Sequence, residues 1–115
     1  MKIGTMVSLN ENVAEKIRDV KKYGLQSFQL VCWNMEMFTD ENAETVRQTA
    51  DECGLELTAL WCGWEGEAVW NFMDGYHTLG LVPVRYRVKR VENLKKGSDF
   101  AKKLGVTDVI THMGF

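Results

Sequence analysis

The stretch Gly54-Leu55-Glu56-Leu57-Thr58-Ala59-Leu60-Trp61-Cys62 joins the end of one predicted helix to a predicted strand. Gly54 follows a helical pattern of apolar residues, and glycine just past a helix is the usual left-handed cap because it has no Cβ. The apolar run 57–62 is typical of a parallel strand that is covered on both faces. The stretch therefore marks one helix-to-strand junction of an α/β fold.

The same junction occurs twice more in the chain. Gly24 precedes the apolar run 27–32, Gly105 precedes the run 106–111, and residues 2–7 supply a further strand at the start. The predicted order is therefore strand, helix, strand, helix, strand, helix, strand. From Gly24 to Gly54 is 54 − 24 = 30 residues, which is about the length of one strand–helix unit.

Each of the three predicted helices carries its apolar residues on one stripe and therefore packs one face only. The stripes are Val13, Ile17, Val20 and Tyr23; Ala43, Val46, Ala50 and Cys53; and Val91, Leu94, Ala101 and Leu104. Asn10 is expected to cap the first helix, and Thr39 or Asp40 the second. Gly97 and Ser98 lie on or near the third stripe, which predicts a close approach of that helix to the sheet.

The third unit is longer than the second by an insertion. From Gly54 to Gly105 is 105 − 54 = 51 residues, so the excess is 51 − 30 = 21 residues, which we place at about 64–84. Because consecutive strands with right-handed crossovers put all helices on one face, the opposite face of the apolar strands would be bare. A closed (β/α)₈ barrel covers that face by curling the sheet and needs about 250 residues. The pattern predicts the first four units of such a barrel.

Composition excludes several classes of protein. The chain has 115 residues, 45% hydrophobic and 26% charged, with a net charge of −2. This mildly acidic balance provides no footprint for nucleic acid or an anionic membrane, and no apolar stretch approaches the ~18 residues that a membrane span needs. Residues 1–5 lead directly into a strand, without a secretory signal. Three cysteines without a C-x-x-C pair predict reduced thiols and a cytoplasmic protein.

Several segments resemble the sugar phosphate isomerase/epimerase group, the xylose-isomerase-like TIM barrels, which are related in fold to the endonuclease IV family. They are Gln29-Leu30-Val31-Cys32-Trp33-Asn34, Trp61-Cys62-Gly63-Trp64, Val69 to Gly75, Thr78 to Pro83, Lys95 to Asp108 and Thr111 to Phe115. The resemblance covers the whole chain, 1–115, but only the N-terminal half of that family's barrel.

The resemblance implies an activity that needs the other half. Members hold a divalent metal (Mn, Mg, Co or Zn) near the barrel mouth, with carboxylates and histidine from strands five to eight for metal binding and proton transfer. No position here corresponds to those strands. We therefore expect pocket-wall residues for a sugar or sugar phosphate, and no activity from this chain alone.

Pocket residues in a TIM barrel lie at the carboxyl ends of the strands. That rule selects Trp33, Trp61, Trp64 and His112 as substrate-binding candidates. Indole faces suit the C–H face of a sugar, and the indole N–H can hold a hydroxyl. The alternative for the tryptophans is packing at the top of the barrel. The alternatives for His112 are metal ligation and a structural role.

The insertion is expected to form a lid, with its glycines as flexible points. Within it, Trp70 is expected to pack against the insertion itself, and Asp74 with His77 is a weak candidate for metal binding. The basic residues Arg85, Arg87, Lys89 and Arg90 can meet a substrate phosphate, but a solvated helix start is the expected role.

Two other functions stay open beside the metal-dependent isomerase or epimerase. An endonuclease-IV-like barrel acting on DNA is opposed by the acidic pI of about 5.7 and the absence of a basic groove. A catalytically inactive module is the third hypothesis. Open strand edges and a bare apolar face predict that two copies form a homodimer.

Overall fold

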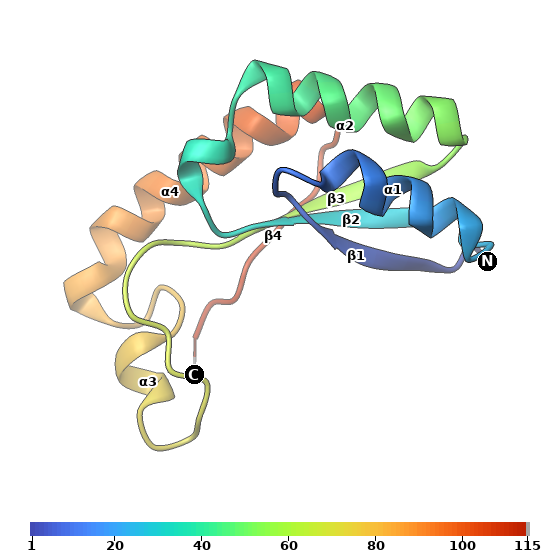
Figure 1. Ribbon diagram of the computed structural model, residues 1–115. Helices are drawn as coiled ribbons and strands as arrows, with labels where there is room; N and C mark the ends of the chain where they lie inside the picture. Colours follow the sequence, from blue (N-terminus) through green and yellow to red (C-terminus); the bar gives the residue numbers. More distant parts are fainter. Residues whose placement is uncertain (115) are drawn as a thin grey trace.

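The computed structural model describes residues 1–114 and confirms the α/β architecture (Figure 1). The strands are β1 (Gly4–Ser8), β2 (Ser27–Cys32), β3 (Glu56–Cys62) and β4 (Val109–Ile110). The helices are α1 (Val13–Lys22), the short 3₁₀ helix η1 (Met35–Met37), α2 (Asp40–Cys53), α3 (Gly75–Thr78) and α4 (Val84–Leu104). The strands form one sheet in the order β1-β2-β3-β4, and every pair is parallel.

The helices α1, α2 and α4 lie on one face of the sheet (Figure 1). Strand residues on that face alternate with residues on the other, because successive side chains of a strand point to opposite sides. Facing the helices are Val7, Phe28, Leu30, Cys32, Leu60 and Cys62, and from the helices come Ile17, Val20, Val46, Ala50, Phe100 and Leu104, all buried. The single stripe expected on each helix therefore forms one core with one face of the sheet.

Helix ends follow the expected capping chemistry with one exception. The Oγ1 of Thr39 accepts a hydrogen bond from the N–H of Asn42, and Gly54 and Gly105 cap α2 and α4 in the left-handed conformation. The prediction for Asn10 was wrong. Asn12 occupies the N-cap of α1, while the Oδ1 of Asn10 accepts from the N–H of Asn12 and so turns the chain one step earlier.

Two further details differ from the expectation. The last strand comprises only Val109–Ile110, because residues 106–108 bring the chain up from α4 before it pairs with β3. Gly97 is buried, and a Cβ on it would overlap the sulfur of Cys62 on β3, which confirms the close approach of α4 to the sheet. Ser98, however, is exposed, since it lies one residue beyond the contact.

The insertion leaves the sheet after β3, forms α3 away from the helix layer, and returns to α4 (Figure 1). Its return segment pairs with the segment that follows β4, because the N–H of Leu81 donates to the carbonyl oxygen of Met113 at 2.8 Å. Gly80 has a φ of 67° and lies directly on the backbone of Met113, so no side chain fits there. Of the expected flexible points, Gly63, Gly75 and Gly80 are all buried.

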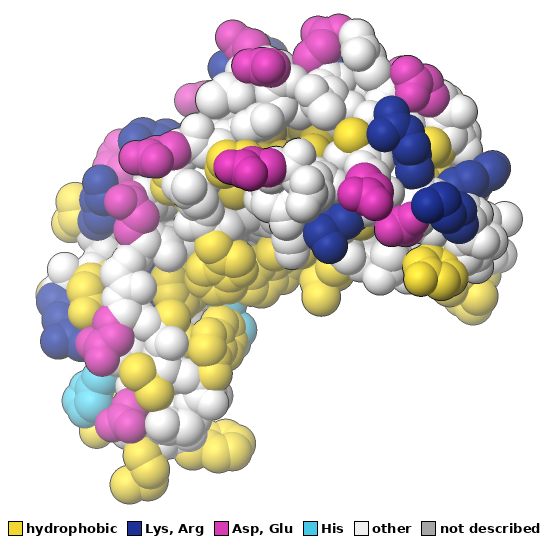
Figure 2. All heavy atoms as spheres, in the orientation of Figure 1, with side chains coloured by type: hydrophobic (Ala, Val, Ile, Leu, Met, Phe, Trp, Pro, Cys, Tyr) yellow, Lys and Arg dark blue, Asp and Glu magenta, His cyan; other side chains and the backbone are white. Residues whose placement is uncertain are grey.

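The face of the sheet opposite the helices carries exposed apolar side chains. Hydrophobic atoms gather along the concave underside between the sheet and the insertion (Figure 2). Met6, for example, is 65% exposed although it lies within β1. Among residues 1–114, no helix combines the length and the apolar character that crossing a membrane requires.

Candidate functional site

A row of side chains crosses the face of the sheet opposite the helices. Ser8 pairs with Val31, Val31 with Trp61, and Trp61 with Ile110, one residue from each strand. Two residues further along each chain, the same face carries Trp33, Gly63 and His112, because side chains repeat every second residue. The carboxyl ends of three parallel strands thus bring sequence-distant residues together.

The predicted pocket residues form one aromatic cluster at these strand ends, centred on Trp33. Its ring centroid lies 5.1 Å from that of Trp61, 5.0 Å from that of Trp64 and 6.2 Å from that of Trp70. Trp70 in turn meets the imidazole of His112 edge to face at 5.0 Å. These separations are within the 4.5–7 Å range of favourable ring contacts. The prediction that Trp70 packs within the insertion was therefore wrong.

The members of the cluster differ in exposure. Trp33 is 38% exposed and Trp70 56%, while Trp61 and His112 are half-buried. Trp64 is only 2% exposed, and its indole N–H has no hydrogen-bond partner among residues 1–114. Trp33, Trp70 and His112 are thus the members that offer surface to a ligand, and Trp64 lies behind them.

The imidazole of His112 accepts a hydrogen bond from the backbone of the segment that follows it. The N–H of Gly114 donates to Nδ1 at 3.1 Å. A neutral imidazole that accepts at Nδ1 carries its proton on Nε2. A protonated ring nitrogen donates a hydrogen bond and does not bind a metal, whereas a metal-binding histidine donates from its other nitrogen to an acceptor. Because Nδ1 accepts this hydrogen bond, the imidazole of His112 is better suited to donate a hydrogen bond from its other nitrogen than to bind a metal there.

The described residues do not fit a metal centre. Among residues 1–114, no group of three or more His, Cys, Asp or Glu side chains converges on one point. Asp74, the weak candidate in the insertion, accepts a hydrogen bond from the amide of Asn71, and the ring of His77 packs on Tyr76. Zinc sites, both structural and catalytic, take at least three protein ligands.

The basic residues at the start of α4 have different environments. Arg85 is exposed and pairs with Glu67 at 2.9 Å, and Arg87 donates to the carbonyl oxygens of Leu81 and Val82. Arg90, expected to be solvated, is fully buried beside Trp64. The interpretation of Arg90 as a solvated residue was therefore wrong.

One signal in the sequence could have revealed the buried role of Arg90. Counting back from Leu104 and Gly97 at helical spacing, the buried stripe of α4 continues through Asn93 and Arg90. The apolar pattern alone begins at Val91, which is 36% exposed and lies beside the stripe. Polar residues on a core-facing stripe are buried only when their hydrogen bonds are satisfied.

Two of the three cysteines lie beneath the cluster, on the helix side of the sheet. Cys32 and Cys62 pair in register on β2 and β3 and are buried, whereas Cys53 is half-buried, and all three are free thiols. Burial raises the pKa of Cys32 to about 11 and that of Cys62 to about 12. Such thiols stay protonated near neutral pH and act as small apolar side chains.

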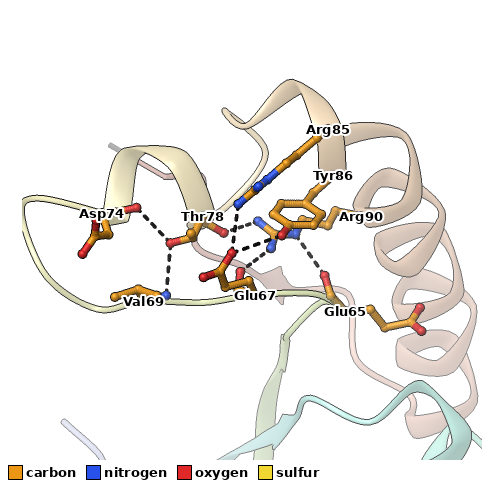
Figure 3. Close-up of polar contacts among 8 residues, drawn as sticks. All are labelled: Glu65, Glu67, Val69, Asp74, Thr78, Arg85, Tyr86 and Arg90. Carbon is orange, nitrogen blue, oxygen red and sulfur yellow. Dashed lines mark hydrogen bonds and ion pairs between the residues drawn. The ribbon is translucent and has the colours of Figure 1, made fainter.

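A cavity of about 900 Å³ lies within the insertion, between α3 and the start of α4. Two of its polar side chains have partners within the insertion and α4: Glu67 accepts from Arg85 and Tyr86, and the Oγ1 of Thr78 bonds with the backbone of Val69 and Asp74 (Figure 3). The aromatic cluster, by contrast, is an open wall at the strand ends, where TIM-barrel sites form.

Comparison with solved structures identifies the architecture. No protein-family model matches the chain, and no curated protein matches it. A xylose isomerase domain protein from Planctomyces limnophilus superposes with a TM-score of 0.86 at 26% identity over 99% of this chain and 41% of that one. The 3-keto-D-glucoside 4-epimerase YcjR from E. coli superposes with a TM-score of 0.61 at 22% identity over 95% of this chain and 36% of that one.

The chain has the fold of the first four β/α units of a xylose-isomerase-like TIM barrel, as the sequence resemblance implied. It spans less than half the length of each of these two proteins. The bare face of the sheet corresponds to the face that lines the inside of such a barrel, and the aromatic cluster lies at the carboxyl ends of the strands.

Proposed function

We propose that this chain is the pocket wall of a metal-dependent isomerase or epimerase acting on sugars or sugar phosphates. The observation that carries the proposal is the convergence of Trp33, Trp70 and His112 at the carboxyl ends of β2, β3 and β4. Two solved barrels of the same architecture bear isomerase and epimerase names. Active sites of TIM barrels lie at this end of the strands, which supports a binding site there.

Each residue of the wall contributes a different interaction. The exposed faces of Trp33 and Trp70 bind the C–H face of a sugar ring, since indole combines a large apolar surface with a polar N–H. The imidazole of His112, which meets Trp70 edge to face, contributes a polar ring beside these two faces. Trp61 and Trp64 support Trp33 from behind, because both rings lie about as far from it as packed aromatic side chains do.

The metal and the proton-transferring carboxylates belong to the other half of such a barrel. We assign to this chain the binding and orientation of the sugar, through the side chains of Trp33, Trp70 and His112. The three free thiols suit a cytoplasmic enzyme, because disulfides form mainly in oxidising compartments outside the cytosol.

Sugar binding is tested by tryptophan fluorescence of the full chain during titration with D-fructose, D-xylose and D-fructose 6-phosphate. We expect saturable changes in the wild type that Trp33→Ala and Trp70→Ala each weaken by about tenfold or more, equal to about 1.4 kcal/mol. Val88→Ala is the matched control, because Val88 is exposed on α4 away from the cluster. The absence of saturation with all three sugars would contradict the proposal.

We also propose that a second copy of the chain covers the bare face of the sheet. Ile3, Met6 and Met113 are each more than half exposed on or beside the edge strands β1 and β4, and unpaired edges with apolar surface favour association. Light scattering on a sizing column should give the mass of a dimer. A monomer at high protein concentration would exclude this arrangement.

A further inference from the structure

The buried guanidinium of Arg90 binds both ends of the insertion. Its Nε donates to the carbonyl oxygen of Glu65 at 3.1 Å and Nη2 donates to that of Glu67 at 2.7 Å, on the outgoing segment. On the return segment, its Nη1 donates to the carbonyl oxygen of Thr78 at 2.6 Å (Figure 3). The same Nη1 donates to the carbonyl oxygen of Gly80, also at 2.6 Å. Four backbone carbonyls from two segments thus converge on one side chain.

Two aromatic rings enclose the same guanidinium. Its carbon lies 3.9 Å from the ring centroid of Trp64 and 4.4 Å from that of Tyr86. Desolvation lowers the pKa of Arg90, but arginine keeps its charge in proteins. Planar stacking together with in-plane donation uses the geometry of guanidinium, which a lysine ammonium does not reproduce.

The contacts continue from Arg90 to the exposed part of the aromatic cluster. Thr78, whose carbonyl binds Arg90, accepts a hydrogen bond at Oγ1 from the N–H of Val69 at 3.1 Å (Figure 3). Val69 is followed directly by Trp70, whose ring meets His112. On the other side of the guanidinium, Trp64 contacts Trp33. Arg90 therefore contacts both the segment that leads to Trp70 and the ring of Trp64, which packs on Trp33.

We propose that Arg90 is the positioning residue of the sugar-binding wall: by joining residues 65–67 to residues 78–80, it sets where Trp70 lies against Trp33 and His112. Arg90 accordingly joins the two ends of the insertion, so the insertion does not move as a lid hinged at residue 64. This inference rests on the proposed sugar site for its functional consequence, but the placement of Trp70 can be measured without any sugar.

The test compares wild type, Arg90→Lys and Arg90→Met, each with and without Trp70→Phe, by near-UV circular dichroism. The signal that Trp70→Phe removes reports the packing of the Trp70 ring. We expect that signal to be lost in both Arg90 variants while the far-UV spectrum is unchanged, because the helix layer of α1, α2 and the C-terminal part of α4 does not contain Arg90. Sugar titration should then give affinities about tenfold or more below wild type.

Arg85→Lys is the matched control, since Arg85 lies on the same helix in an exposed ion pair with Glu67. It should retain the Trp70 signal. If Arg90→Met unfolds, Arg90→Lys and the Thr78→Val variant, which removes the link to Val69 but leaves Arg90 intact, still decide the question. A full Trp70 signal in Arg90→Lys or in Thr78→Val would overturn the inference. If the wild type binds no sugar but the Arg90 variants still lose the Trp70 signal, the positioning role is supported and only the sugar site is contradicted.

Discussion

Gly63 packs directly against the indole ring of Trp33, so closely that a Cβ on Gly63 would overlap the ring. The two residues share one row of the sheet, and the N–H of Gly63 continues the ladder to the carbonyl oxygen of Cys32 at 2.8 Å. Because Gly63 has no side chain, Trp33 can lie over β3 and reach Trp61, Trp64 and Trp70. The centre of the aromatic cluster therefore depends on a glycine.

The Gly63→Ala variant should displace Trp33. We expect a changed near-UV spectrum and a weaker fluorescence response to sugar, because the added methyl group meets an aromatic ring that is itself packed on three others. Gly54→Ala is the control: it has open space around it but a φ of 63°, so it should cost about 1–2 kcal/mol of stability without altering the Trp33 signal. An unchanged near-UV spectrum in Gly63→Ala would contradict this view of Trp33.

Gly97→Ala should destabilise the protein although alanine is the better helix former. The substitution gains about 1 kcal/mol of helix propensity, but the new methyl group overlaps the sulfur of Cys62, and overpacking costs about 1–3 kcal/mol. In a Cys62→Ala background, Gly97→Ala should cost less stability, because the sulfur is gone and the nearest remaining atom is the Cβ of residue 62, 3.2 Å away. Chemical denaturation of the four proteins measures this coupling, and additive effects would refute the contact.

Thiol reactivity should separate the three cysteines. At about pH 8, only Cys53 should react quickly with a water-soluble disulfide reagent, since reaction needs an accessible thiolate and Cys32 and Cys62 are buried. All three should react after unfolding in urea. Cys53→Ser should abolish the fast phase, and rapid reaction in that variant would mean that one of the buried thiols is accessible.

The same thiols make stability depend on alkaline pH. Burial raises the pKa of Cys32 to about 11 and that of Cys62 to about 12, against 9.0 for an unperturbed thiol. Unfolded thiols therefore ionise at lower pH than folded ones, so their contribution to stability is complete below pH 9 and decreases as the pH rises toward 11–12. Urea denaturation across that range should give a decrease that Cys32→Ala reduces.

Asn93→Ala should loosen the base of the insertion. Asn93 is fully buried, its Nδ2 donates to Glu65 at 2.6 Å, and its Oδ1 accepts from the N–H of Glu65 at 3.1 Å. Removing both bonds leaves a backbone N–H without its partner and costs about 1–3 kcal/mol. Asn42→Ala is the comparison, because it removes a half-buried amide of α2 that donates to the carbonyl oxygen of Met37 in η1. A smaller loss of stability in Asn93→Ala than in Asn42→Ala would contradict this prediction.

The hydrogen bond from Asn93 also lowers the pKa of Glu65, followed by the bond from Lys89. A depressed carboxyl pKa contributes stability above its unfolded value and loses it as pH falls through the folded value. The wild type should therefore lose more stability than Asn93→Ala between neutral and acidic pH, and NMR titration of Glu65 should give a higher pKa in the variant.

Local patterns were enough to predict the elements of the fold. The left-handed glycines after the three long helices, Gly24, Gly54 and Gly105, and the apolar runs that follow them depend on interactions within a few residues. The position of Trp33, Trp61 and His112 at strand ends follows from parallel pairing alone. Where the prediction failed, at Asn10 and in the length of β4, the outcome depended on how the chain leaves β1 and enters β4.

The sequence by itself determined the alternation of strands and helices, the single packed face of each helix and the position of Trp33, Trp61 and His112 at the strand ends, because periodicity and capping are local properties of the chain. Only the tertiary structure decided that Trp70 meets His112, that Gly63 lies beneath Trp33 and that Arg90 is buried among four carbonyl groups. These contacts join segments up to 42 residues apart, such as Trp70 and His112. The residue type alone does not show whether an arginine is exposed or buried. The hydrogen-bond partners of Arg90 are defined only once the insertion has folded back onto α4.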